Sequence, residues 1–151
     1  DLMPLIQANK KIEFFLKKYP DSDYSIDLKF KKDLIQNQLA AKELYVAKYY
    51  TSVQKWVPAI NRLKIIVKDY DTTVFVEEAL QRIVEINYYL GLESEAKKYA
   101  QVLGYNYNSS EWFEQSYKLF NKDYKIKEIS KDKIKDKKDS NFLKKILKKI
   151  K

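Results

Sequence analysis

The sequence of 151 residues contains no cysteine and no histidine. Their absence excludes disulfides, thiolate nucleophiles, imidazole bases and every metal site that depends on cysteine or histidine ligands. Catalysis by this chain would have to use carboxylates, lysines or tyrosines. Glu43 and Glu85 lie inside expected helices, but no glycine-rich loop or metal-binding motif accompanies them. We therefore expect a protein that is not an enzyme and that binds no cofactor.

Glycine and proline are also scarce, with two and three copies. A sheet-rich fold needs a turn about every eight to twelve residues, so this scarcity favours long helices. No stretch reaches the roughly 18 apolar residues of a membrane-spanning helix. The chain starts at Asp1, already inside an amphipathic pattern, and we expect it to be a piece of a longer protein.

The positive charge of the chain is concentrated at one end. The net charge is +9, and residues 121–151 hold thirteen lysines against five acidic residues. Residues 1–120 carry 17 basic and 16 acidic residues, so we expect no broad nucleic-acid-binding face on them. Arg62 and Arg82 are the only arginines among the thirty basic residues. The guanidinium of arginine is a planar donor that can bind a carboxylate through two hydrogen bonds, and lysine cannot replace it in this role.

The N-terminal part of the chain predicts two helices. Asp1 is placed to cap the first helix, Pro4 fits its first turn, and the segment 19–22 ends it. Residues 24–50 contain neither glycine nor proline, so we expect one long helix of about 40 Å there. Its apolar residues step by four positions at Ile26, Phe30 and Leu34, followed by Ile35 and Leu39.

Residues 38–73 predict a helical hairpin, in which the long helix turns over 51–55 into a second helix over 56–70. Small residues occur where the two helices have to approach closely, at Ala40, Ala41, Ala47 and Ala59. Bulky residues stand beside them at Tyr50, Trp56, Leu63 and Ile66. Neither helix could bury its apolar stripe alone, so this unit needs neighbouring copies of itself.

The C-terminal part of the body predicts three more helices. Thr73 is placed to cap the first of them, and Gly91 ends it as a C-terminal cap. The second covers residues 92–103. A short closing helix around Trp112 and Tyr117 would cover the last exposed face of the array.

Three similar stop segments, at residues 19–22, 70–73 and 107–110, indicate repeats. The second and third lie 37 residues apart, as do Ala59 and Ala96, whereas the first and second lie 51 apart. The extra 14 residues correspond to about four helical turns added to the long helix. This is a degraded tetratricopeptide pattern. The alternative is a generic helical bundle with accidental spacing.

We therefore predict an all-α fold of tetratricopeptide-like helical-hairpin repeats (an α-solenoid) with one elongated helix and a basic C-terminal tail. The expected domains are a repeat domain over residues 1–120 and a lysine-rich tail over 121–151 that ends in a basic amphipathic helix. The repeat domain divides into a half repeat, two repeats and a capping helix, at 1–22, 24–73, 74–110 and 111–120.

The order of several motifs resembles the C-terminal half of the BamD (ComL-type) lipoproteins, which are tetratricopeptide-like components of the outer-membrane β-barrel assembly machine. The first is a "YP-S-Y" entry at residues 19–24, followed by an "LA-E-VA-YY" helix at 39–50. A "W-A-NR" helix start at 56–62 and an "eeAL-LVE-Y-LGL-EA" run at 77–96 complete the likeness. The resemblance covers about residues 1–120. Asp71 and Asn108 depart from it, because the family has proline there.

The resemblance implies a periplasmic scaffold, anchored to the outer membrane by a lipid on a cysteine that is not in this sequence. Family members hold the POTRA region of the barrel-forming subunit BamA through these C-terminal repeats, and other accessory lipoproteins dock on them. A general tetratricopeptide interaction module in another complex is the alternative function.

Arg62 is the leading candidate for partner binding. The inward face of its helix is defined by Ala59, Leu63 and Ile66, so Arg62 points outward. The resemblance implies that it faces the POTRA partner, and Asn61, Lys55 and Tyr49 are assigned to the same site. The alternative is a solvated arginine that pairs with Asp69 or with nothing. Tyr50 and Trp56 are expected to pack between helices.

The tail offers a second candidate surface. Its last eleven residues combine lysines with apolar positions on one side, at Phe142, Leu143, Ile146, Leu147 and Ile150. Such a basic amphipathic helix is expected to lie on an anionic membrane surface or on a partner, or to stay solvated. Nucleic-acid binding through the tail is a further hypothesis, but nothing in the body supports it and we expect no nucleic-acid partner.

Overall fold

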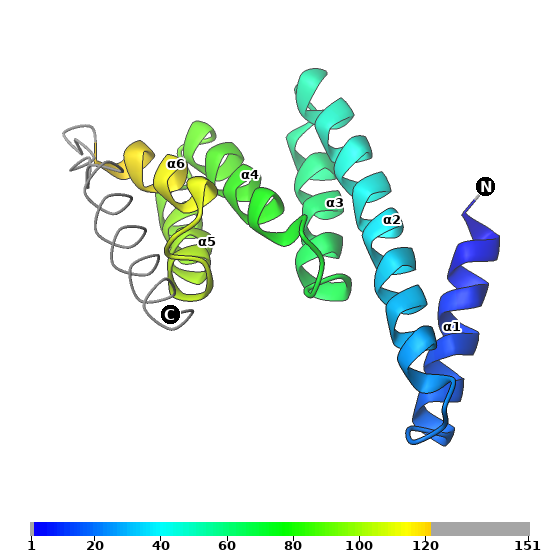
Figure 1. Cartoon of the computed structure of the whole chain (residues 1–151). Coiled ribbons are helices and arrows are strands. Elements are labelled where there is room, and N and C mark those ends of the chain that lie inside the picture. The colour runs from blue at the N-terminus through cyan, green and yellow to red at the C-terminus, as the bar shows by residue number, and fades with distance from the viewer. Residues whose placement is uncertain (1, 122–151) are drawn as a thin grey trace, which may run out of the picture. The chain divides into compact units, whose positions relative to one another are not determined.

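The computed structural model describes residues 2–121, and these residues form six α-helices without a strand (Figure 1). The helices are α1 (Met3–Lys18), α2 (Ser25–Ser52), α3 (Trp56–Asp69), α4 (Val76–Tyr89), α5 (Glu93–Asn106) and α6 (Glu111–Phe120). The all-α class and the helical-hairpin repeats are therefore confirmed. The predicted tail and the predicted cap at Asp1 lie outside the described residues, and the domain boundary at residue 120 stays a prediction.

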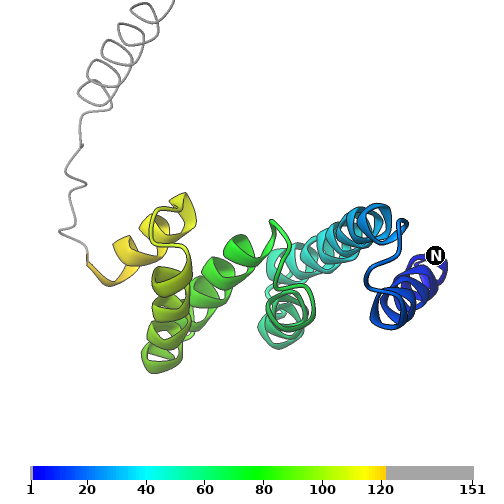
Figure 2. The same ribbon diagram turned by 60° about the horizontal axis from the view of Figure 1, so that its bottom comes forward.

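Each helix packs on its neighbours along the chain, which is the arrangement of a helical repeat array. The pairs α1 and α2, α2 and α3, α3 and α4, and α4 and α5 are in contact, and α6 packs against both α4 and α5 (Figures 1 and 2). The helix α4 therefore has neighbours on three sides. Eight of its 14 residues are buried, more than in any other helix of the described part.

The helix bounds reproduce the repeat spacing of the sequence. The helices α3 and α5 have 14 residues each, and their first residues, Trp56 and Glu93, are 37 positions apart. Each stop segment also contains the same kind of hydrogen bond, in which a tyrosine amide donates to the carbonyl four residues earlier. The amides of Tyr19, Tyr70 and Tyr107 make this bond at 2.8, 3.1 and 2.8 Å.

The core extends from α2 and α3 across α4, and a close helix–helix contact lies where α2 meets α3. Ala40, Ala47 and Ala59 are at most 1% exposed, so the two helices approach closely there and Leu63 and Ile66 fill the space beside them. Tyr50 and Trp56 pack against this core as expected. The Trp56 ring also lies 5.1 Å from that of Tyr89 at the end of α4, which ties the α2–α3 hairpin to the next one.

Some predicted helix ends are displaced. Helix α2 continues to Ser52, so the turn over 51–55 is shorter than expected, and α5 continues to Asn106 rather than ending at 103. Gly91 has a φ of +76° just beyond the end of α4, which confirms its role as a C-terminal cap.

The predicted cap at Thr73 is wrong. Helix α4 begins at Val76, and Phe75 occupies the cap position. The hydroxyl of the buried Thr73 instead donates to the carbonyl of Tyr70 at 2.7 Å. Two more turn residues therefore separate the stop segment from the next helix, and Thr73 stabilises that turn rather than the helix.

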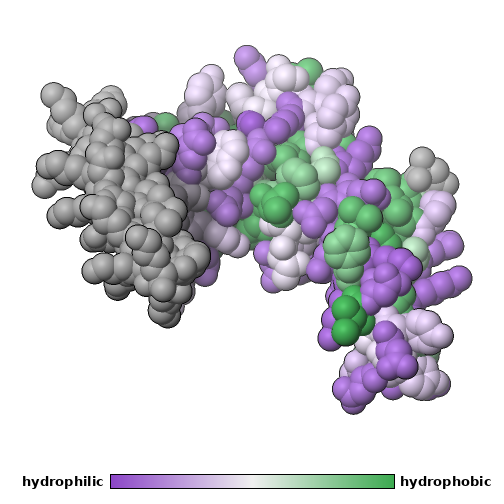
Figure 3. Space-filling model, viewed as in Figure 1, coloured by the Kyte–Doolittle hydropathy of each residue, from purple (hydrophilic) through white to green (hydrophobic). Residues whose placement is uncertain are grey.

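The apolar stripe at the start of α2 is not buried. The residues Ile26, Phe30 and Leu34 are 81%, 69% and 53% exposed, and Figure 3 shows hydrophobic side chains on the surface of this part of the molecule. The cause is the unequal length of the hairpin, because α2 has 28 residues and α3 has 14. The start of α2 extends beyond α3 and packs on α1, and the turn after α3 reaches α2 at Gln36 and Asn37.

The closing helix α6 covers α4 and α5 only partly. An apolar groove of about 290 Å³ remains along α5 and α6. Its walls include Gly104 and Phe113, and a Cβ added at Gly104 would lie 2.7 Å from the Phe113 ring. The absence of a side chain at Gly104 therefore lets α6 approach α5 closely.

We expect the packed hairpin and the extension of α2 to differ in how much stability is lost when a leucine there is replaced by alanine. Leu63→Ala removes a side chain that is 0% exposed and should lower the free energy of unfolding by about 2–5 kcal/mol. Leu34→Ala removes the same atoms from a side chain that is 53% exposed and should cost less than about 1 kcal/mol. Urea unfolding of the two full-length variants tests this, and equal costs would contradict the described packing.

Candidate partner-binding site

Arg62 lies on α3 and makes an ion pair with Glu43 on α2. Its Nη1 is 3.1 Å from Oε2 and 3.5 Å from Oε1 of Glu43. The close approach of the two helices brings these side chains together, because Glu43 is flanked on α2 by Ala40 and Ala47, which face α3. The Glu43 side chain is 19% exposed and that of Arg62 is 42% exposed. Glu43 is thus the more buried member of the pair, and Arg62 remains accessible to solvent.

Arg62 pairs with Glu43, whereas the sequence analysis named Asp69 as its possible partner within the chain. The outward direction was predicted correctly, since Ala59, Leu63 and Ile66 on the same helix are 0% exposed. The interhelical pair was missed because Glu43 was considered only as a catalytic carboxylate. Its position between Ala40 and Ala47 was the signal that placed it next to α3.

The negative charge of Glu43 also affects a tyrosine on α3's C-terminal side. Tyr70, at the end of α3, has a raised pKa because of its burial and, next, because of the negative charges of Glu43 and Asp69. The charge of Glu43 therefore acts on the end of α3 as well as on Arg62.

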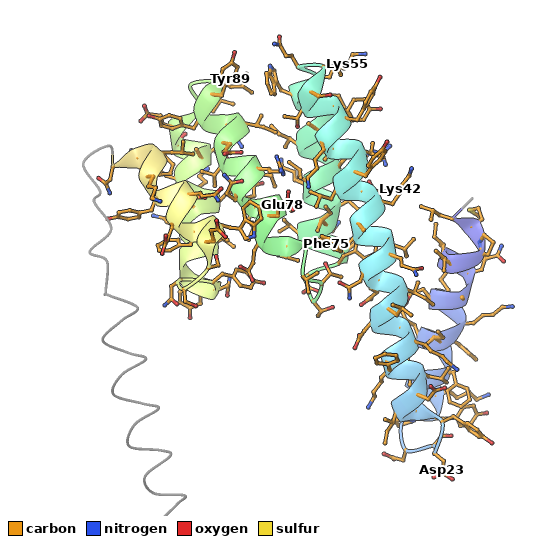
Figure 4. All side chains as sticks on the ribbon, turned by 45° about the horizontal axis from the view of Figure 1, so that its top comes forward. Asp23, Lys42, Lys55, Phe75, Glu78 and Tyr89 are labelled. Atoms are coloured by element: carbon orange, nitrogen blue, oxygen red, sulfur yellow. The ribbon has the colours of Figure 1, made fainter. Side chains whose placement is uncertain are left out.

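The four predicted site residues do not form a single cluster. Asn61 is exposed beside Arg62 on α3. Lys55 lies in the turn that joins α2 and α3 (Figure 4), two helical turns away from Arg62. Tyr49 is 61% exposed near that end of α2, but it follows Glu43 by six residues and so points about 120° away from it around the helix. The described structure thus places Asn61 beside Arg62, whereas Lys55 and Tyr49 lie toward the other end of the hairpin.

The second arginine, Arg82, is paired within the protein. Arg82 donates from Nε to one oxygen of Glu78 at 2.8 Å, and its Nη2 forms an ion pair with the same oxygen at 2.7 Å. Lys48 on α2 reaches that oxygen as well, at 2.8 Å. Glu78 faces the α2–α3 hairpin (Figure 4), and its side chain is only 13% exposed. This triad links α2 to α4 and occupies the Nε–Nη2 edge of Arg82.

The pKa of Glu78 reflects this environment. Burial alone would raise the pKa, but the hydrogen bonds and positive charges of Lys48 and Arg82 outweigh that effect and hold the pKa below its ordinary value.

Residues 2–121 show neither a metal-binding cluster nor a membrane-spanning helix. No group of three or more acidic side chains there is arranged to hold a metal ion. None of the six helices combines the length and the apolar character that crossing a membrane requires. The predicted tail residues Phe142, Leu143, Ile146, Leu147 and Ile150 lie outside the described residues.

Comparisons with known proteins agree on one family. The model of the YfiO family, described as an outer membrane lipoprotein, matches residues 1–103. The outer membrane protein assembly factor BamD of Rickettsia prowazekii (strain Madrid E) is 42% identical over 112 residues, which are 74% of this chain and 45% of that protein. BamD of Caulobacter vibrioides is 35% identical over 115 residues, 76% of this chain and 38% of that protein.

A more distant relative shows the same relation. BamD of Vibrio cholerae (serotype O1) is 28% identical over 106 residues, 70% of this chain and 44% of that protein. The chain therefore spans less than half the length of each of these three relatives.

We expect Glu78 to make stability depend on pH. A carboxyl group whose pKa is lowered by folding stabilises the folded state above its unfolded pKa, and this contribution is lost as the pH falls through the folded pKa. Glu78→Gln should therefore lower the melting temperature at pH 7, and the difference from wild type should shrink below about pH 4.5. Thermal unfolding of both proteins between pH 7 and pH 3 measures this. Glu85→Gln, at an exposed position of the same helix, is the control and should show no such difference.

Proposed function

Because the chain belongs to the YfiO family of outer membrane lipoproteins, the family of the BamD assembly factors, we propose that it is a non-enzymatic scaffold of the machinery that assembles β-barrel proteins in the outer membrane. It acts by docking to the POTRA region of the barrel-forming subunit. Other accessory lipoproteins are further partners. The full-length protein is held by a lipid anchor at the periplasmic face of the outer membrane.

The geometry of Arg62 is the observation that carries the docking proposal. Arg62 is the arginine of the family's "NR" motif, and its side chain is 42% exposed. The Nε and Nη2 atoms have no acceptor among the described residues, whereas Arg82 uses the same two atoms for Glu78. A guanidinium edge of this kind binds a carboxylate through two parallel hydrogen bonds. Arg62 is thus suited to receive an acidic side chain of a partner.

The scaffold role also agrees with the chemistry of the chain. A helical repeat array exposes long helix faces without a deep catalytic cleft. The groove along α5 and α6 is lined mainly by small and aromatic residues. The chain contains no histidine or cysteine that could act as a general base or nucleophile.

Arg62→Ala should weaken binding to the POTRA region of the barrel-forming subunit by at least about tenfold, because an acidic group of the partner loses its donor. Isothermal titration calorimetry measures this affinity directly. Alanine is a better choice than glutamate here, since a glutamate would face Glu43 and destabilise the hairpin by repulsion. The folding cost of the alanine should stay below about 1 kcal/mol, because the pair is partly exposed.

The matched control is Lys64→Ala, which removes one positive charge from an exposed position of the same helix. It should leave the affinity nearly unchanged. An Arg62→Ala variant that binds as tightly as wild type would refute docking through this site.

The tail is proposed to bind an anionic membrane surface or a partner through its five apolar positions. The sequence pattern alone supports this, with apolar residues four apart and lysines between them. Co-sedimentation with liposomes that contain phosphatidylglycerol should recover the full chain but much less of a chain that ends at Asp139. Equal recovery of the two chains would remove membrane binding and leave the partner as the target of the tail.

A further inference from the structure

The structure assigns a role to Glu43 that rests on the proposed docking function. We propose that Glu43 is a positioning residue of the partner-binding site, which holds the Arg62 guanidinium so that its Nε–Nη2 edge receives a carboxylate of the partner. Glu43 itself does not contact the partner. The two arginines of the chain supply the comparison on which this inference is built.

The contact between Glu43 and Arg62 is confined to one corner of the guanidinium. Both carboxylate oxygens of Glu43 lie on Nη1, at 3.1 and 3.5 Å. None of the described residues accepts a hydrogen bond from Nε or Nη2. A second carboxylate can therefore bind at that edge without displacing the first, because the guanidinium has five N–H donors in a fixed plane.

The two donor atoms that remain available in Arg62, Nε and Nη2, are the atoms that Arg82 uses to contact Glu78. In Arg82, Nε and Nη2 converge on Glu78, one helical turn earlier on the same helix. Arg62 has Pro58 one turn earlier, which offers no carboxylate at that position. Its acidic neighbour instead comes from the facing helix and approaches the opposite corner. The residue four positions earlier thus occupies the Nε–Nη2 edge of Arg82 and leaves that of Arg62 available.

Glu43 is suited to hold the guanidinium in place. Its side chain is less exposed than that of Arg62, at 19% against 42%, and it projects from the part of α2 where Ala40 and Ala47 are packed against α3. Its backbone is therefore fixed relative to that of Arg62. A long side chain that is held in its binding conformation before the partner arrives loses less conformational freedom on binding.

Four proteins form a double-mutant cycle that tests this role: wild type, Glu43→Ala, Arg62→Ala and the double variant. The affinity for the isolated POTRA region is measured by calorimetry, and the melting temperature of each variant is recorded. Glu43→Ala should weaken binding about three- to tenfold, the factor expected for one side chain that has to be ordered on binding. In the Arg62→Ala background the same substitution should have no effect, because Glu43 acts only through Arg62.

Two further variants sharpen the test. Glu43→Gln keeps an oxygen that can accept from Nη1, so it should lose less affinity than Glu43→Ala. Glu85→Ala removes an exposed glutamate of another helix, α4, and it should leave binding unchanged, which controls for the loss of one negative charge. A general loss of folding would weaken binding in both backgrounds, whereas a positioning role weakens it only when Arg62 is present.

Several results would overturn the inference. Tighter binding by Glu43→Ala would show that Glu43 competes with the partner for Arg62. An additive loss in the double variant would show that Glu43 acts independently of Arg62, and an equal loss in Glu43→Gln would contradict positioning by a hydrogen bond. If Arg62→Ala itself has no effect, the docking site fails. If Arg62→Ala weakens binding and Glu43→Ala does not, the docking site stands and only the role of Glu43 is refuted.

Discussion

The close packing of α2 on α3 is the constraint on which the rest of the described structure depends. Ala40, Ala47 and Ala59 remove the side-chain volume between the two helices, and that short distance allows an arginine on one helix to reach a glutamate on the other. The same contact sets the position of Trp56, whose ring packs on Tyr89 of the next hairpin. Larger residues at the alanine positions would therefore disturb the core, the ion pair and the junction between hairpins together.

Much of the fold was predictable because it depends on local chemistry that repeats along the chain. The stop segments at Tyr19, Tyr70 and Tyr107 end their helices with the same backbone hydrogen bond, and the spacing of 37 and 51 residues follows from the helix lengths. The long helix was predictable because no glycine or proline interrupts it. Thr73 misled the prediction, since a threonine before a helix also suits a turn, and the two uses leave a similar trace in sequence.

The features that were not predictable depend on contacts between distant residues. Periodicity showed that Ile26, Phe30 and Leu34 share a face of α2, but not that α3 ends too early to cover them. Likewise, the outward direction of Arg62 followed from its helix, whereas its pairing with Glu43 depends on how two helices are aligned. Tyr49 was assigned to the site as an aromatic residue, and its place on α2, on a different side of the helix from Glu43, depends on the rotation of that helix.

The unequal lengths of α2 and α3 also divide the described residues into regions of different local stability. At its start, α2 packs on α1, and no residue of α1 is buried. A segment with so little buried surface opens at a lower free energy than the whole fold. We therefore expect amide protons of α1 to exchange with solvent through local opening, and those of α4, with eight buried residues, to exchange only on global unfolding. The chain combines a slowly exchanging centre with an N-terminal hairpin that opens separately from it.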